Sequence, residues 1–151
     1  MIVGEIIADK YKILRKLGEG SFSSVFEAEH IYKGNKVAIK FDTDDVSKAL
    51  IENEINIYLY LIREGVKNIA GFKSFGNLKS NNYIIMERLD CTLADYYKHY
   101  HHNRTLYDKK RDNLKILGML IKLIKQFSSV NLLHRDIKAE NFVFDQNKNL
   151  C

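Results

Sequence analysis

The chain has 151 residues, of which 46% are hydrophobic and 28% charged, and its net charge is +5. These proportions are ordinary for a chain that folds around a buried core, and they exclude a long disordered tail. The positive charges are scattered and form no continuous basic helix, which favours solvated faces over a nucleic-acid surface. An acidic partner remains the alternative explanation of the charge.

Cysteine use and the lack of long apolar runs indicate a compartment. Cys91 and Cys151 have neither metal-ligand spacing nor a pairing pattern, which is typical of a reducing environment. The first ten residues lack the basic and apolar segments of a signal peptide, and no apolar stretch is long enough to span a bilayer. We therefore expect an intracellular protein, cytoplasmic or nuclear, without a membrane segment.

The first part of the chain predicts strands. Residues 11–14 lead into a glycine-rich stretch, residues 24–30 alternate polar and apolar side chains, and residues 36–41 follow the Gly34-Asn35 turn signal. Short connections of this kind join neighbouring antiparallel strands. The spacing therefore predicts three antiparallel strands in succession.

A helix and two more strands are expected next. Apolar residues recur at helical spacing over 46–63, with Ser47 at the start and Gly65 after the end. Residues 70–75 and 83–86 predict two strands separated by a turn. The first part of the chain is thus expected to form a five-stranded antiparallel sheet with one helix.

After this sheet the pattern becomes helical. Thr92 and Asp95 are spaced like a capping box at the start of a short helix over 92–101. A long amphipathic helix with a buried apolar stripe is expected over 112–130, and loop with short strand pieces over 132–151. The expected stripe consists of Leu114, Leu117, Ile121 and Ile124.

The glycine-rich stretch is the first motif that could carry chemistry. Residues 18–25 read GEGSFSSV and connect two predicted strands. Glycines let a backbone come close to phosphate groups and offer amide N–H groups to them. A dinucleotide-binding turn would need a helix after the glycines, and a strand follows here instead. An ordinary glycine-rich hairpin turn remains the alternative.

A lysine and a glutamate follow at suggestive positions. Lys40 ends the apolar strand over 37–40, and a strand running back under the glycine-rich turn would place its ammonium group beneath bound phosphates. Glu54 on the following helix would pair with Lys40 and hold it, if this side chain faces the sheet. Glu52 is the other candidate, and a solvated face is the alternative for both glutamates.

The segment 134–141, which reads HRDIKAEN, is the most specific motif. It places Asp136, Lys138 and Asn141 in one short loop after a long helix. A carboxylate can accept a hydroxyl proton, an ammonium group can stabilise a transferred phosphoryl group, and an amide oxygen can ligate magnesium. The three side chains together therefore indicate phosphoryl transfer.

In this order and spacing, the motifs resemble the eukaryotic protein kinase superfamily over about residues 11–151. The resemblance implies an α+β, protein-kinase-like fold. Residues 1–86 would form the ATP-binding N-lobe, a five-stranded antiparallel sheet with one helix. Residues 87–151 would form the hinge and the beginning of a helical C-lobe, through the catalytic loop. Residues 54–58, 65–66 and 86–89 look similar to the casein kinase 1 group.

The resemblance also implies roles for single residues. Asp136 would orient and deprotonate the substrate hydroxyl, Lys138 would contact the γ-phosphate, and Asn141 would ligate magnesium. His134 and Arg135 would be structural. The residues implied at the nucleotide are Leu17, Gly18, Glu19, Gly20, Ser21, Phe22, Ser23, Val25, Ala38, Lys40, Glu54, Met86, Glu87, Leu89 and Val143.

The resemblance implies a serine/threonine kinase that uses ATP and Mg²⁺ on protein substrates, because a lysine stands two residues after Asp136. Ser23 replaces the family's third glycine, and looser packing of the turn is expected there. The family's D-F-G motif would follow the hairpin over 144–150, but the sequence ends at Cys151. We expect a fragment that is inactive alone. A naturally short kinase-like module that binds nucleotide or a partner is the alternative.

Overall fold

The structure, a computed structural model, describes residues 3–20, 22–100 and 104–151. The chain divides into two compact units. The first, called the sheet unit here, comprises Met1–Ile62 and Ala70–Arg88, and the second, the helical unit, comprises Arg63–Ile69 and Leu89–Cys151.

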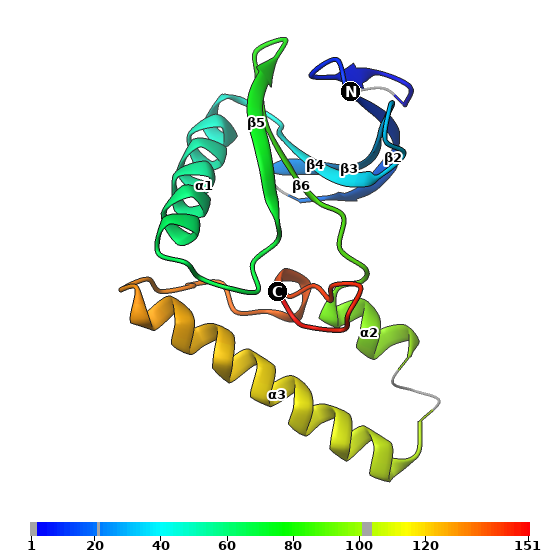
Figure 1. Ribbon diagram of the computed structural model, residues 1–151, viewed down its shortest axis with the longest axis vertical. Coiled ribbons are helices and arrows are strands. Elements are labelled where there is room, and N and C mark those ends of the chain that lie inside the picture. The colour runs from blue at the N-terminus through cyan, green and yellow to red at the C-terminus, as the bar shows by residue number, and fades with distance from the viewer. Residues whose placement is uncertain (1–2, 21, 101–103) are drawn as a thin grey trace. The chain divides into compact units, whose positions relative to one another are not determined.

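One antiparallel sheet dominates the sheet unit, with strands in the order β1-β2-β3-β4-β6-β5 (Figure 1). The sequence predicted five strands, and the structure has six. The additional strand, β1, pairs with β2 through only two residues, which is too short for an alternating pattern to reveal it. The strands are β1 Ile6–Ile7, β2 Tyr11–Glu19, β3 Ser23–His30, β4 Lys36–Asp42, β5 Phe72–Leu78 and β6 Asn81–Glu87.

One face of the sheet holds the main hydrophobic core. Strands β2 to β4 curve strongly in Figure 1. Side chains alternate between the two faces along a strand, which places Val37, Ile39 and Phe41 of β4 together on the core side. The buried cluster consists of Ile7, Ile13, Phe26, Ala28, Val37, Ile39, Phe41, Tyr83 and Ile85.

Helix α1, Asp45–Arg63, packs on the other face of the sheet (Figure 1). Its buried residues Ile51 and Ile55 form a second cluster with Ile84 of β6. Ser47 was expected to cap the start of this helix, but it lies inside the first turn, and its N–H donates to the Asp44 Oδ1 at 2.8 Å, so that Asp44 takes the capping position. The Ser47 hydroxyl oxygen accepts hydrogen bonds from the backbone N–H groups of Thr43 and Asp44, both at 2.9 Å.

The helical unit contains α2 (Leu93–His99), α3 (Leu106–Ser129) and the short 3-10 helix η1 (Ala139–Asn141). The capping box of Thr92 and Asp95 is present at the start of α2, as predicted. Helix α3 begins six residues earlier than the predicted 112, because Thr105 caps it by accepting a hydrogen bond from the Asp108 N–H at 3.2 Å. The buried core consists of Leu93, Ile116, Leu123, Phe142, Phe144 and Leu150.

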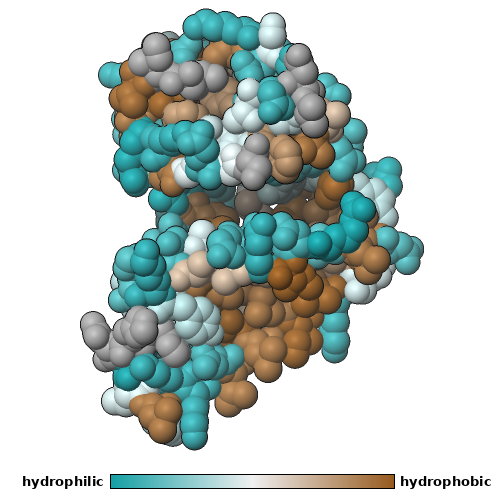
Figure 2. Space-filling view, turned by 180° about the vertical axis from the view of Figure 1, so that it is seen from behind, coloured by the Kyte–Doolittle hydropathy of each residue, from teal (hydrophilic) through white to brown (hydrophobic). Residues whose placement is uncertain are grey.

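The apolar stripe that the helical spacing marks on α3 is exposed in the described chain. Leu114 is 71% exposed and Leu117 53% exposed, and Ile121 and Ile124 are exposed as well. Helix α3 instead buries Ile116 and Leu123, which lie on the opposite side of a helix with 3.6 residues per turn. Hydrophobic residues accordingly gather on the surface of the helical unit (Figure 2).

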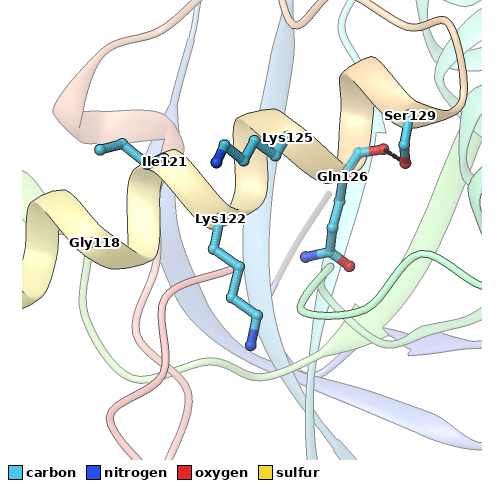
Figure 3. A pocket seen from close by; sticks show the side chains of 6 residues that line it. All are labelled: Gly118, Ile121, Lys122, Lys125, Gln126 and Ser129. Carbon is cyan, nitrogen blue, oxygen red and sulfur yellow. Dashed lines mark hydrogen bonds between the residues drawn. The ribbon is translucent and has the colours of Figure 1, made fainter.

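A shallow groove runs along α3 near its end (Figure 3). Every residue that lines it belongs to this one helix, so the groove is an open surface feature. Within it, the side-chain oxygen of Gln126 accepts a hydrogen bond from the Lys67 N–H at 2.9 Å, which ties the segment Arg63–Ile69 to α3. Within the described residues, no helix combines the length and apolar character needed to cross a membrane.

Candidate functional site

The glycine-rich turn joins β2 to β3 in the sheet unit. Gly18 lies opposite Val25 across the two strands, and the Gly20 N–H donates to the Ser23 carbonyl oxygen at 2.8 Å. No atom lies closer than 3.8 Å to the position that a Cβ would take at either glycine. The backbone of the turn is therefore open to the approach of another group.

The other residues expected around this turn have varied surroundings. Leu17 is half-buried at an irregularity in the strand pairing, and Phe22 is exposed. Glu19 forms an ion pair with Lys16 at 2.7 Å. Ser21, which was also expected at the nucleotide, lies outside the described residues.

The register of the sheet aligns four of the expected residues on one face. Lys40 lies opposite Val25 of β3 and opposite Ile84 of β6, and Ala38 lies opposite Met86 of β6. Paired residues point to the same face, and residues two apart along a strand also share a face. Because Ile84 packs against α1, this face is the one that α1 covers.

Lys40 and Glu54 form an ion pair between β4 and α1. The Lys40 Nζ lies 2.6 Å from the Glu54 Oε2, and the two side chains are 25% and 30% exposed. Glu52 points elsewhere and accepts a hydrogen bond from the Asn82 Nδ2 at 3.2 Å. The ion pair expected from the sequence is thus present, with Glu54 as the partner. It fixes an ammonium group on the strand below the glycine-rich turn.

The remaining expected residues are Glu87 at the end of β6, and Leu89 and Val143 in the helical unit. The Glu87 N–H donates to the Gly71 carbonyl oxygen at 2.7 Å, which fixes the end of β6. Leu89 is buried within the helical unit. In the same unit, the backbone of Val143 exchanges two hydrogen bonds with Cys151, at 3.0 and 2.9 Å.

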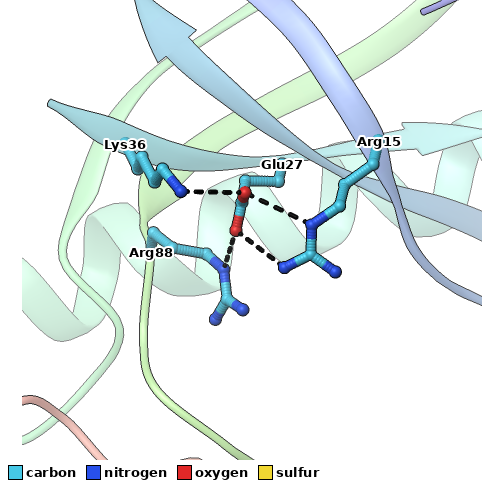
Figure 4. A network of polar contacts seen from close by, with 4 residues as sticks. All are labelled: Arg15, Glu27, Lys36 and Arg88. Carbon is cyan, nitrogen blue, oxygen red and sulfur yellow. Dashed lines mark hydrogen bonds and ion pairs between the residues drawn. The ribbon is translucent and has the colours of Figure 1, made fainter. Parts of the chain in front are cut away.

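A buried carboxylate that the sequence analysis missed lies on the same face of β3 as Val25. Glu27 is only 4% exposed, and it lies opposite Ala38 in the sheet. Arg15, Lys36 and Arg88 surround it (Figure 4). The signal in the sequence was that Glu27 lies two residues after Val25 in the same strand. Its side chain is therefore expected on the same face of the sheet as that of Val25.

The polar residues of the segment 134–141 come together in the helical unit. The Lys138 Nζ lies 2.9 Å from the Asp136 Oδ2. The Asn141 side-chain N–H group donates to the Asp136 backbone oxygen at 2.9 Å and to its Oδ2 at 2.7 Å. The Asp136 and Lys138 side chains are 60% and 52% exposed, so both can be reached by a substrate.

These contacts set the charges of the loop. The hydrogen bond from Lys138 lowers the pKa of Asp136, and the bond from Asn141 lowers it further. The same bond to Asp136 raises the pKa of Lys138. At neutral pH, Asp136 is therefore an anion that can accept a hydrogen bond from a hydroxyl group, and Lys138 is a cation beside it.

The backbone of this loop is held in an uncommon conformation. Arg135 has a φ of 61°, in the left-handed region that residues other than glycine rarely adopt. His134, just before it, stacks on Phe142 with ring centroids 5.5 Å apart and meets the Phe127 ring edge-on at 5.7 Å. This packing and the bonds of Asn141 over-determine the loop, which is what such a conformation requires.

The residues present fit a magnesium ion in part. Asn141 and Asp136 offer oxygen atoms, the ligand type that magnesium prefers. No group of three or more His, Cys, Asp or Glu side chains suited to a metal occurs in the described part of the chain. Asp145 uses its Oδ1 in a turn, where it accepts from the N–H groups of Asn147 and Asn149 at 2.8 and 2.7 Å.

Known proteins share these features. Residues 11–151 match the family model described as protein kinase domain. The chain is 30% identical over 146 residues to the probable serine/threonine-protein kinase PknB of Lactococcus lactis subsp. lactis (strain IL1403), covering 92% of this chain and 22% of that protein.

A solved structure supports the fold. The crystal structure of the PF14_0431 kinase domain aligns with a TM-score of 0.81 at 19% identity, and the alignment covers 97% of this chain and 43% of that one. The chain thus spans 22% of the curated relative's length and 43% of the solved chain's length.

Proposed function

Because the chain belongs to the protein kinase domain family, we propose that it carries the ATP-binding part and catalytic loop of a serine/threonine protein kinase. The observation that carries the proposal is the contact set of the catalytic loop, where Asp136 contacts both Lys138 and Asn141. The Lys40–Glu54 ion pair of the sheet unit supports it. The family's chemistry requires both arrangements.

The sheet unit supplies most of the proposed nucleotide contacts. The backbone of the turn from Gly18 to Ser23 covers the phosphates, and Lys40 binds the α- and β-phosphates while Glu54 holds it. Val25 and Ala38 pack on the adenine, and Met86 lies behind it. The adenine edge is bound by backbone groups of Glu87 and Leu89, and Val143 is the further apolar contact.

The catalytic loop supplies the proposed chemistry. The Asp136 carboxylate orients the serine or threonine hydroxyl and accepts its proton as the oxygen bonds to the γ-phosphorus and the bond to the β-phosphate oxygen breaks. The Lys138 ammonium group neutralises charge on the transferred phosphoryl group. Asn141 holds Mg²⁺ through its side-chain oxygen, and the ion supplies charge neutralisation on the phosphates.

Three finer proposals concern the bounds of the two lobes, the residue that is phosphorylated and the subgroup. Residues 1–86 form the N-lobe, and residues 87–151 form the hinge and part of the C-lobe. Lys138, two residues after Asp136, supports action on serine and threonine. The segments similar to the casein kinase 1 group, 54–58, 65–66 and 86–89, support that subgroup.

The central test is phosphate transfer from radiolabelled ATP to a peptide array by the full-length protein. Asp136→Asn is expected to lower transfer by about 10²- to 10⁴-fold, the usual contribution of a catalytic base. Labelling mainly on tyrosine would contradict the serine/threonine assignment. Transfer that survives Asp136→Asn undiminished would contradict the assigned role of the loop.

Two neighbouring glutamates provide a matched control for the nucleotide half. Glu54→Gln removes the anion that holds Lys40, so we expect a raised KM for ATP. Glu52→Gln makes the same chemical change two residues away on another side of α1, where the carboxylate accepts a hydrogen bond from the Asn82 side chain, and should leave KM unchanged. Equal effects of the two variants would show that the ion pair has no specific role.

The 151 residues alone are proposed to bind ATP weakly and to transfer no phosphate. Asn141 is a neutral ligand, and the Asp145 carboxylate is engaged in its turn, so neither brings a free carboxylate beside Asp136 to help hold magnesium. The assay is the same radiolabel transfer on purified residues 1–151, with Asp136→Asn as the control. Transfer that vanishes in the control would overturn this proposal.

A further inference from the structure

The Glu27 carboxylate is the centre of a polar network that the proposed reaction does not use (Figure 4). The Arg88 Nε donates to it at 3.0 Å, Arg15 donates through Nε and Nη2 at 3.3 and 3.2 Å, and the Lys36 Nζ donates at 3.3 Å. Burial alone would raise the pKa of Glu27, but the bonds from these three cations lower it overall. Glu27 is therefore held as an anion inside the sheet unit.

The three cations are not equivalent. The Arg15 and Lys36 side chains are 61% and 54% exposed and come from the strands on either side of β3, which the sheet's own hydrogen bonds already fix. Because these two cations are exposed, water screens part of their attraction to Glu27. Arg88 is only 25% exposed and follows the last residue of β6, beyond the final pair of the β4–β6 ladder. The bond from Glu27 to Arg88 therefore constrains backbone that the ladder does not.

The constrained backbone is the part proposed to bind the base. Arg88 stands between Glu87 and Leu89, whose backbone groups are proposed to bind the adenine edge. Glu27 itself lies opposite Ala38, whose partner on the next strand is Met86. The network thus lies among the base-contacting residues, one row along the sheet from Lys40 and the phosphate-contacting turn.

We propose that Glu27 is a positioning residue for the nucleotide base: its carboxylate holds Arg88 and thereby fixes the backbone that binds the adenine edge. This inference rests on the proposed function. It separates base binding from phosphate binding, because Lys40, held by Glu54, binds the phosphates from a different row of the sheet. A purely structural role would affect both parts of the nucleotide equally.

The test compares two fragments of ATP on the full-length protein by isothermal titration calorimetry. Adenosine probes the base contacts, and inorganic tripolyphosphate probes the phosphate contacts. Glu27→Gln and Arg88→Gln are each expected to weaken adenosine binding by about tenfold, the cost of losing a hydrogen bond between charged groups. Tripolyphosphate binding should change by less than about twofold, within the scatter of surface substitutions.

Controls and kinetics sharpen the result. Lys36→Gln removes one of the two more exposed cations and should leave both affinities unchanged. The double variant of Glu27 and Arg88 should lose no more than either single one. In the transfer assay, KM for ATP should rise with kcat unchanged. If Glu27→Gln does not fold, Arg88→Gln alone decides, because its side chain is partly exposed.

Three outcomes overturn the inference. The first is unchanged adenosine binding in Arg88→Gln. The second is equal weakening of adenosine binding and tripolyphosphate binding. The third is a Lys36→Gln variant with the same effect on binding as Arg88→Gln. Failure of the unmodified protein to bind either fragment is a different result, because it overturns the proposed function and this inference with it. Retained tripolyphosphate binding with lost adenosine binding supports the inference.

Discussion

Apolar side chains are covered differently in the two units. In the sheet unit, one face of the sheet encloses its own core and α1 covers the other, so that Ile39 and Ile84 are fully buried. In the helical unit, α3 buries Ile116 and Leu123 but leaves Leu117 exposed on its other side. Both faces of the sheet are thus covered by apolar packing, whereas only one side of α3 is covered within the described helical unit.

The difference teaches how far an apolar pattern can be interpreted. A strand has two faces and a period of two, so one alternating run identifies its buried face. Helix α3 carries apolar residues on two opposite sides, and both sides repeat at helical spacing. The pattern therefore identified the helix correctly and could not say which side is covered.

The largest expected effect compares the same substitution in the two units. Ile39→Ala should lower the free energy of unfolding of the 151-residue chain by about 2–5 kcal/mol, because it leaves a cavity in a filled core. Ile121→Ala, on the exposed side of α3, should change it by less than about 0.5 kcal/mol. Chemical denaturation measures both, and comparable losses would show that the exposed side is covered in solution.

A second comparison concerns a buried and an exposed carboxylate. The pKa values of Glu27 and Asp136 are both lowered in the folded chain, so the stabilisation each gives is present above its unfolded pKa and is lost as pH falls through the folded pKa. Because Glu27 is buried, Glu27→Gln should remove about 1–3 kcal/mol at neutral pH and flatten the loss of stability in acid.

Asp136→Asn is the control for this pH comparison. Its side chain is 60% exposed, so its pair with Lys138 is screened by water and should contribute little to stability. Denaturation midpoints measured across the acid range give both results. An acid profile that flattens in Asp136→Asn and stays unchanged in Glu27→Gln would reverse the comparison.

A smaller effect is expected from a glycine within α3. Gly118 has open space where a Cβ would stand, so Gly118→Ala should raise the free energy of unfolding by about 0.5–1 kcal/mol through helix propensity. Gly76→Ala is the contrasting variant, because its Cβ would meet the Tyr83 ring and must destabilise the sheet unit. A destabilised Gly118→Ala would indicate that another surface lies against α3.

Substitutions on the exposed side of α3 should change the stability of the chain least and its self-association clearly. Replacing Leu117 and Ile121 with glutamine should reduce concentration-dependent light scattering of the 151-residue chain, since exposed apolar patches promote association. The helix content measured by circular dichroism should stay the same. Unchanged scattering would mean that this side of α3 does not drive association.

The sequence predicted some of the site for a physical reason. The glycine-rich turn and the catalytic loop are each one continuous stretch of sequence. Their chemistry could therefore be recognised from residues close together in the chain, such as Asp136 and Lys138. The Glu27 network could not be recognised, because the fold brings Arg15 and Arg88 to it from distant parts of the chain. The start of α3 was missed because its first turns are polar and carry no apolar period.

The environment of Ser47 has a consequence for covalent modification. Its hydroxyl is fully buried, accepts two backbone hydrogen bonds and donates one to the Asp44 carbonyl oxygen at 2.8 Å. A phosphate group on this oxygen would break all three bonds and place two negative charges where no solvent reaches. Ser47 should therefore stay unmodified by any serine kinase as long as the start of α1 is folded.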